Sequence, residues 1–166
     1  YELFSNYGVE NIIRIGSAGA YTDQLDLFDV VLAESAYSES SFAYAQGKEE
    51  RDTLKSSEKL NDFIRSAAKE LNIKLHEGTI HSSDVFYRQE PVQERLFKEK
   101  GCLCVEMESF ALFHNANVLG KNAACILTIS DSLVTSKVTT SEQRQTAFNQ
   151  MMEIALNTCV LINKQN

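Results

Sequence analysis

Hydrophobic residues along this chain form short apolar runs that alternate with stretches of helical spacing, a pattern that predicts strands and helices in turn. The run at 123–129 is apolar throughout, which is typical of a strand buried on both faces of a sheet. The run at 11–15 leads into 16–20, a segment of glycine, serine and alanine that predicts a tight turn. Further strands are expected at 29–33, 75–80 and 103–105.

Two stretches combine helical spacing with end signals. At 57–72, apolar residues recur every three or four positions, and Ser57 stands where the helix N-cap is expected. The helix expected at 107–119 is followed by Gly120, and glycine is favoured just beyond helix ends.

A third helix is expected from about 141 to 162, where Thr140 and Gln143 resemble a capping box. The N-terminal residues up to Gly8 have the pattern of a helix tail that ends at this glycine. The segment 36–56 has weak periodicity, so we expect a loop or insertion there.

Strands that alternate with helices predict an α/β fold with helices on both faces of the sheet. The chain has 166 residues, enough for one domain with a sizeable core. It lacks an initiating Met and opens on an apparent helix tail. We therefore expect the chain to begin inside a larger domain.

Composition excludes several classes of function. The formal net charge is −7, and an acidic chain is repelled by phosphate backbones, so nucleic-acid binding is not expected. No apolar run approaches the ~20 residues of a membrane span, and the N-terminus shows no signal-peptide pattern. We expect no membrane association.

The four cysteines all lie in apolar contexts and predict small buried side chains in a reducing cytosol, hence a cytoplasmic protein. The cysteines and the three histidines lack the spacing of metal ligands, so no metal site is expected. The cysteines are Cys102, Cys104, Cys125 and Cys159.

Arg14 stands inside an apolar strand, and a buried guanidinium requires an anion. Its partner is either a structural carboxylate or a bound phosphate. The following turn favours phosphate, because Gly16 and Gly19 allow backbone amides to approach a ligand and Ser17 adds a hydroxyl.

Carboxylates follow two of the predicted strands. Glu106 and Glu108 come after 103–105 at the start of a helix, where the dipole keeps them ionised and suited to accept hydrogen bonds from a sugar diol. Residues two apart on a helix point to different sides, so they are not expected to form an acid–base pair. Asp131, preceded by Ser130, ends the most buried strand and is either a functional acid or a turn residue.

The segment 81–87 places His81, Ser82 and Asp84 close together, but it lacks the nucleophile-elbow pattern of a catalytic triad. Phe86 and Tyr87 after it could form a stacking wall for a planar base or part of the core. His114 is expected to be a structural residue with its hydrogen bonds satisfied.

Taken together, these motifs resemble one family, the bacterial-type, hexameric purine nucleoside phosphorylases. The resemblance extends from residue 1 to about 161, with the motifs in the family's order and spacing. The motifs stand at 14–20, 82–87, 105–108, 130–131 and 139–146.

The resemblance implies a pentosyltransferase that cleaves purine (deoxy)nucleosides with phosphate, giving the free base and (deoxy)ribose 1-phosphate for purine salvage. Asp131 would protonate N7 of the purine, assisted by Arg144. The implied phosphate-binding residues are Arg14, Ser17 and Gly19. Met107 would pack on the sugar and Glu108 would bind its hydroxyls, while the backbone of Val105 and Glu106 would contact the base. The implied nucleoside-binding residues are Phe86, Val105, Glu106, Met107, Glu108 and Ser130.

The resemblance also implies a three-layer α/β/α sandwich around a mixed central sheet, assembled as a hexamer from three dimers that share active sites. No cofactor is implied beyond phosphate as co-substrate. We interpret 1–166 as a single nucleoside phosphorylase domain without its N-terminal portion, which in the family carries a Gly-Asp-Pro phosphate loop, further arginines and a His lent to the neighbouring subunit. Two alternatives stay open: a water-using nucleosidase of the methylthioadenosine type, and an inactive nucleoside-binding fragment.

Overall fold

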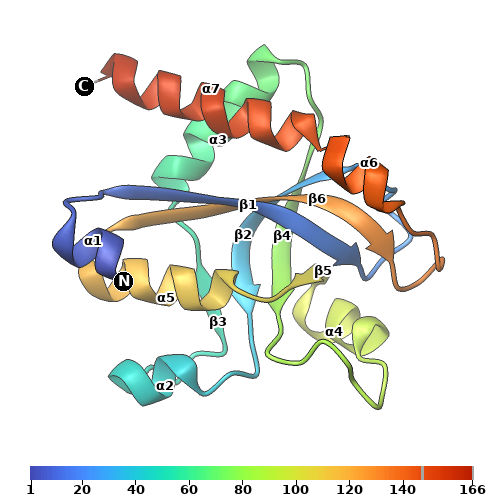
Figure 1. The fold of residues 1–166 in the computed structure, drawn as a ribbon. Helices are drawn as coiled ribbons and strands as arrows, with labels where there is room; N and C mark the ends of the chain where they lie inside the picture. The colour runs from blue at the N-terminus through green and yellow to red at the C-terminus, as the bar shows by residue number, and fades with distance from the viewer. Residues whose placement is uncertain (147, 166) are drawn as a thin grey trace.

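The computed structural model describes residues 1–146 and 148–165, which form a mixed α/β fold (Figure 1). Helices and strands alternate along most of the described chain, as the hydrophobic pattern predicts. The elements are α1 (Glu2–Asn6), β1 (Asn11–Ala20), β2 (Val30–Tyr37), α2 (Phe42–Gly47), β3 (Thr53–Lys55), α3 (Glu58–Glu70), β4 (Leu75–Ser82), α4 (Gln93–Lys100), β5 (Cys102–Glu106), α5 (Ser109–Leu119), β6 (Asn122–Ser132), α6 (Ser141–Thr146) and α7 (Asn149–Gln165).

The six strands form one mixed sheet in the order β3-β2-β4-β5-β1-β6. The pairs β1–β6, β2–β4 and β4–β5 are parallel, whereas β1–β5 and β2–β3 are antiparallel. An additional antiparallel pairing joins β2 to β6, so five strands close on one another in a ring. This closure brings β1, β5 and β6 together around one region of the molecule.

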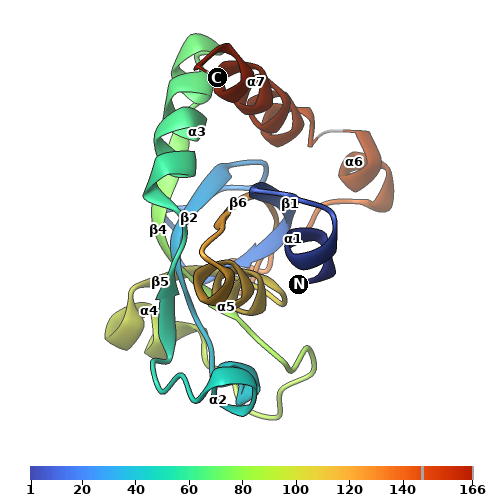
Figure 2. The same ribbon diagram turned by 90° about the vertical axis from the view of Figure 1, so that its left-hand side faces the viewer.

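Helices lie on both faces of the sheet. Figures 1 and 2 show α3 and α7 packed together on one side, with α5 on the opposite side. The strand β6 is buried on both faces because its side chains alternate between two hydrophobic clusters. The side chains that face the α5 cluster are Ala123, Cys125, Leu127 and Ile129, and those that face the α3–α7 cluster are Ala124 and Ile126.

The tight turn predicted at 16–20 is wrong, because these residues continue β1 to Ala20. Neither Gly16 nor Gly19 has a positive φ, and both pair with β6 in extended conformation. The register between the two strands shifts between Ala18 and Gly19. Such a β-bulge turns the strand locally and often lies beside an active site.

The helix predicted over 141–162 is divided into α6 and α7. Its predicted capping box is confirmed: the N–H of Gln143 donates to Thr140 Oγ1 at 3.1 Å, and the N–H of Thr140 donates to Gln143 Oε1 at 2.9 Å. The segment 36–56 is not merely a loop, since it completes β2 and holds α2 and β3. Side-chain periodicity cannot reveal elements as short as these.

The other predicted helix ends agree closely with the structure. Ser57 caps α3 by accepting from the N–H of Leu60, and Gly120 ends α5 in the left-handed conformation. Helix α1 ends at Asn6, and Gly8 takes a φ of +66° just beyond it. Helix α5 begins at Ser109 rather than 107.

Two predictions about individual side chains are wrong, one on the burial of Cys159 and one on the hydrogen bonds of His114. Cys159 is exposed on α7, whereas Cys102, Cys104 and Cys125 are buried as expected. His114 is buried on α5, but its Nε2 has no hydrogen-bond partner among the described residues.

Candidate active site

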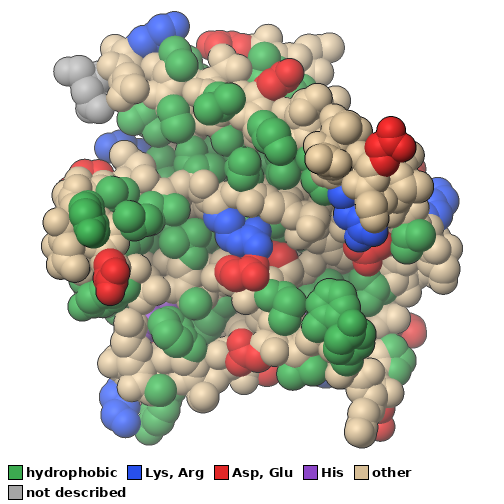
Figure 3. Space-filling view, viewed as in Figure 1, with side chains coloured by type: hydrophobic (Ala, Val, Ile, Leu, Met, Phe, Trp, Pro, Cys, Tyr) green, Lys and Arg blue, Asp and Glu red, His purple; other side chains and the backbone are tan. Residues whose placement is uncertain are grey.

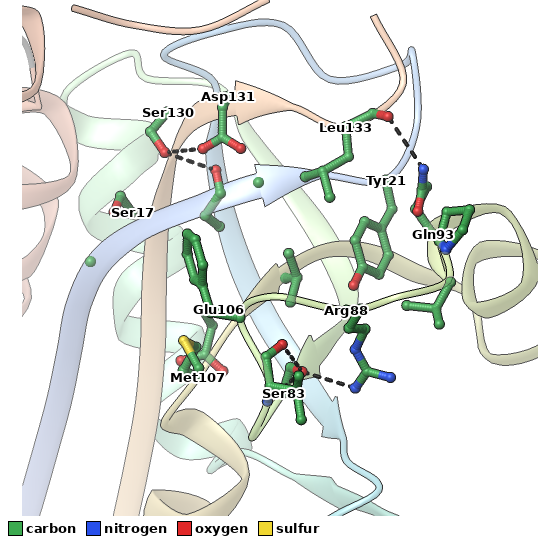
Figure 4. Close-up of a pocket in the computed structure, with 18 of the residues that line it drawn as sticks. Ser17, Tyr21, Ser83, Arg88, Gln93, Glu106, Met107, Ser130, Asp131 and Leu133 are labelled. Atoms are coloured by element: carbon green, nitrogen blue, oxygen red, sulfur yellow. Dashed lines mark hydrogen bonds between the residues drawn. The ribbon is translucent and has the colours of Figure 1, made fainter. Parts of the chain in front are cut away.

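A cavity of about 870 Å³ opens where β1, β5 and β6 meet the loop between β4 and α4. This volume is within the range typical of small-molecule sites, about 300–1,000 Å³. Figure 4 shows side chains from these elements converging on it. Figure 3 shows basic and acidic side chains next to one another near the centre of the face in view, surrounded by hydrophobic side chains.

Ten of the eleven predicted site residues line this one cavity, although they come from four separate segments of the chain. Their roles stay predictions, but their convergence is a property of the fold. The ten are Arg14, Ser17, Gly19, Phe86, Val105, Glu106, Met107, Glu108, Ser130 and Asp131.

Arg14 is paired with carboxylates. Its Nη2 forms an ion pair with Glu108 and lies 3.4 Å from Oε2 of Glu106, while Nη1 lies 3.9 Å from the sulfur of Cys125. Burial by itself would lower the pKa of Arg14, but Cys125, Glu106 and Glu108 together hold it above the usual arginine value. The guanidinium therefore stays charged. Of the two partners that the sequence left open, a carboxylate of the protein or a bound phosphate, the structure shows carboxylates.

Glu106 has a structural function that the sequence did not reveal. Its side chain is buried, and its carboxylate accepts hydrogen bonds from the backbone N–H groups of Glu108 and Ser109 at 3.0 to 3.1 Å. These N–H groups at the start of α5 have no helical partners, so the carboxylate satisfies them. The Glu108 side chain is exposed to the cavity instead.

Asp131 follows the most buried part of β6, as predicted, and projects into the cavity (Figure 4). The Ser130 hydroxyl lies 2.7 Å from Asp131 Oδ1 and 3.3 Å from the carbonyl of Ala18, so it donates to the nearer carboxylate. Gly19 lies opposite, where a Cβ would stand 3.0 Å from Asp131 Oδ2 and 2.5 Å from Leu133 Cδ1. Glycine therefore leaves the space that Asp131 and Leu133 occupy.

The apolar walls are made by exposed side chains. Phe86 is 74% exposed and Tyr87 is 89% exposed, so this pair is not part of the core. Phe86 lines the cavity, as a stacking wall for a base would. Met107 is 38% exposed and lies at the start of α5 beside Glu108.

Arg144 is the predicted site residue that does not line the cavity. It lies exposed on α6, and its backbone N–H donates to Thr140 within that helix start. Its assistance to Asp131 stays a prediction.

Several cavity residues were not predicted, because they belong to no recognisable motif. Tyr21 directly follows the glycine segment, and its hydroxyl lies 2.8 Å from Nδ1 of His81. Burial lowers the pKa of His81 to about 4, so this histidine is neutral at physiological pH. Arg88, two residues after Phe86, also lines the cavity; a cation so near an aromatic wall was a signal available in the sequence.

No group of three or more His, Cys, Asp or Glu side chains that could hold a metal ion occurs in the described part of the chain. Across the same residues, none of the helices combines the length and apolar character that a membrane crossing requires.

Comparison with known proteins shows the family to which this chain belongs. The family model described as the phosphorylase superfamily matches residues 1–161. The chain belongs to the phosphorylase superfamily. Several relatives described as "Purine nucleoside phosphorylase DeoD-type" are 33–44% identical to this chain.

Two relatives illustrate the similarity. The chain is 44% identical to "Purine nucleoside phosphorylase DeoD-type" from Mycoplasma genitalium, covering 94% of this chain and 66% of the relative. It is 41% identical to the protein of the same description from Psychromonas ingrahamii, covering 96% of this chain and 67% of the relative. The chain thus spans about two thirds of the length of these superfamily members.

A solved structure shows the same fold. A futalosine hydrolase mutant from Helicobacter pylori superposes with a TM-score of 0.79, covering 95% of this chain and 71% of that one. At 21% sequence identity, this likeness concerns the superfamily fold alone.

Proposed function

We propose that the protein containing this chain is a purine nucleoside phosphorylase. It would cleave purine (deoxy)nucleosides with inorganic phosphate, giving the free base and (deoxy)ribose 1-phosphate. The observation that carries this proposal is the convergence of Arg14, Phe86, Glu108 and Asp131 on one cavity. The relatives' shared description, at identities that extend over nearly all of this chain, supports the same reaction.

In the proposed reaction, the purine base would bind next to Asp131 in the cavity. A purine anion is a poor leaving group, so a proton delivered to N7 relieves the charge that develops as the glycosidic bond breaks. Ser130 would orient the carboxyl group through its 2.7 Å contact with Oδ1. Phe86 would stack on the face of the base.

The sugar would lie between the base and the start of α5. Glu108 presents a carboxylate that can accept two hydrogen bonds, which suits a vicinal diol. Met107 would pack on the apolar face of the ribose. The Arg14–Glu108 ion pair would place the sugar site directly beside the phosphate site.

Charge balance indicates that the phosphate site needs further cations. Apart from Asp131, the proposed proton donor, the cavity lining carries the carboxylates of Glu90, Glu106 and Glu108, against the guanidinium groups of Arg14 and Arg88. A phosphate dianion would be repelled by this excess of negative charge. We propose that cationic residues outside this chain's sequence, or from another subunit, complete the site.

The experiment is to incubate the complete protein with inosine or adenosine, with and without phosphate, and to measure base release. Phosphorolysis predicts release that requires phosphate and yields ribose 1-phosphate. Asp131→Ala should reduce turnover of both nucleosides by at least about 100-fold, the scale of general acid catalysis. Asp62→Asn, on the exposed surface of α3, is the matched control. Release without phosphate would identify a hydrolase instead.

The assembly and location are proposed on the same basis. The exposed apolar side chains of Tyr7, Val138 and Leu156 support burial against another subunit, within a hexamer of three dimers. We also propose a cytoplasmic enzyme without a cofactor, whose complete domain forms a three-layer α/β/α sandwich. Light scattering of the complete protein would test the hexamer.

A further inference from the structure

The loop that carries Phe86 lies between β4 and α4 and has little packing of its own. Phe86 and Tyr87 are 74% and 89% exposed, and their rings pack edge to face with centroids 5.0 Å apart. Side chains with few neighbours take their position from the backbone. The place of Phe86 at the cavity wall therefore depends on what anchors this loop.

Arg88 anchors the loop from inside the cavity wall. Its Nη2 donates to Ser83 Oγ at 3.0 Å and also forms an ion pair with Glu39. The Ser83 hydroxyl lies 3.0 Å from the carbonyl of Val85 and 3.2 Å from its N–H. Arg88 thus connects both ends of the short segment that contains Phe86.

Glu39, by contrast, is attached to the sheet. It follows Ser38, whose hydroxyl donates to the carbonyl of Ser82 at 2.6 Å and whose N–H donates to the carbonyl of Asp52 at 2.8 Å. These bonds connect the end of β2 to the end of β4 and to the residue that precedes β3. The Glu39–Arg88 pair therefore connects the exposed loop to the end of a sheet strand.

Three basic groups face Glu39. Arg88 is in direct contact, Nη2 of Arg95 lies 3.6 Å away, and Nε2 of His81 lies 3.8 Å away. Partial burial would raise the pKa of Glu39, but these groups together hold it below the usual value. Of the three, Arg88 alone belongs to the loop, since His81 lies on β4 and Arg95 on α4.

We propose that Arg88 is a positioning residue for the nucleoside site, holding Phe86 in place, and that Glu39 is the anchor that fixes Arg88. This inference rests on the proposed function, since it concerns the wall against which the base would stack. An unanchored loop must be ordered when the substrate binds, and the cost of that ordering weakens binding. The effect should fall mainly on the nucleoside, because the charge of Arg88 is already compensated by its ion pair with Glu39.

Steady-state kinetics of the complete protein test the specificity of the effect. If loss of the anchor leaves the loop correctly placed about a fifth of the time, the KM for inosine rises about fivefold in Arg88→Gln and in Glu39→Gln. We expect kcat and the KM for phosphate to change by less than about twofold. Arg88→Lys keeps the charge and should restore part of the affinity.

A double-mutant cycle separates a shared anchor from two independent effects. The variant that carries both Arg88→Gln and Glu39→Gln should resemble Arg88→Gln alone, because Arg88→Gln already removes the ion pair with Glu39 as well as the bond to Ser83. Arg95→Gln is the matched control, since it removes a cation that faces Glu39 but lies on α4 rather than in the loop. Additive effects, or an equal effect of Arg95→Gln, would overturn the proposal.

Hydrogen exchange measured by mass spectrometry tests the anchor without using catalysis. Peptides that cover 83–91 should exchange faster in Arg88→Gln and Glu39→Gln than in the unmodified protein and in Arg95→Gln. Unchanged exchange in both variants overturns the positioning role, whatever the activity. If the unmodified protein shows no phosphorolysis, the proposed function fails, and the exchange result alone decides the anchor.

Discussion

Arg14 and Glu108, 94 positions apart in the sequence, form an ion pair that joins β1 to the start of α5 at the cavity wall. The same Nη2 atom of Arg14 lies 3.4 Å from the buried carboxylate of Glu106. One guanidinium therefore compensates two carboxylates that serve different purposes, one facing the cavity and one capping a helix.

Replacing Arg14 should affect both stability and phosphate binding. In Arg14→Gln, the buried Glu106 loses its cation, and we expect the free energy of unfolding to fall by about 1–3 kcal/mol. In Arg14→Lys, the free energy of unfolding should fall less, because lysine keeps the charge although it lacks the planar guanidinium group. Urea unfolding measures the stability, and the KM for phosphate should rise more than the KM for nucleoside. Equal increases in both KM values would contradict a phosphate-binding role.

Glu106 should matter for stability through its side chain. Glu106→Ala removes the acceptor for two N–H groups at the start of α5, at a cost of about 1–2 kcal/mol. Glu106→Gln keeps one acceptor oxygen and should retain part of that stability. Glu94→Ala on α4 is the control, because its carboxylate accepts a hydrogen bond from the exposed Lys98 rather than from the backbone at a helix start. A Glu106→Ala variant as stable as this control would exclude the capping role.

Gly19 should be sensitive to a single methyl group. A Cβ there would stand 2.5 Å from Leu133 Cδ1 and 3.0 Å from Asp131 Oδ2, so both side chains must move. We expect Gly19→Ala to lower kcat by about tenfold, since small misplacements of a catalytic group are costly. Gly47→Ala in α2 is the control, because its Cβ would meet only His114 atoms at 3.8 Å. Unchanged kcat in Gly19→Ala would argue against Asp131 as the proton donor.

His81 should contribute to acid sensitivity. Its pKa falls from 6.5 to about 4 on burial, so the folded state resists protonation more than the unfolded state does. Stability is therefore retained above about pH 6.5 and falls as the pH decreases towards about 4, by up to about 3 kcal/mol. Urea unfolding across this range should give a flatter profile for His81→Gln, whose amide can still meet Tyr21. Parallel profiles would exclude this contribution.

Local signals were sufficient for most elements of the fold. Ser57 and Gly120 marked helix ends because capping depends on residues only a few positions apart. The segment 16–20 misled the same reasoning, since its glycines suggested a turn while pairing with β6 kept it extended. Sheet pairing between distant strands leaves no local signal.

The sequence by itself determined the alternation of strands and helices and, through its motifs, ten of the residues that line the cavity. Only the tertiary structure decided which carboxylates meet Arg14 and that Glu106 caps α5. It also brought Glu39, from the end of β2, to Arg88. Helix and strand preferences act over a few residues, whereas these ion pairs depend on segments 49 to 94 positions apart being brought together by the fold.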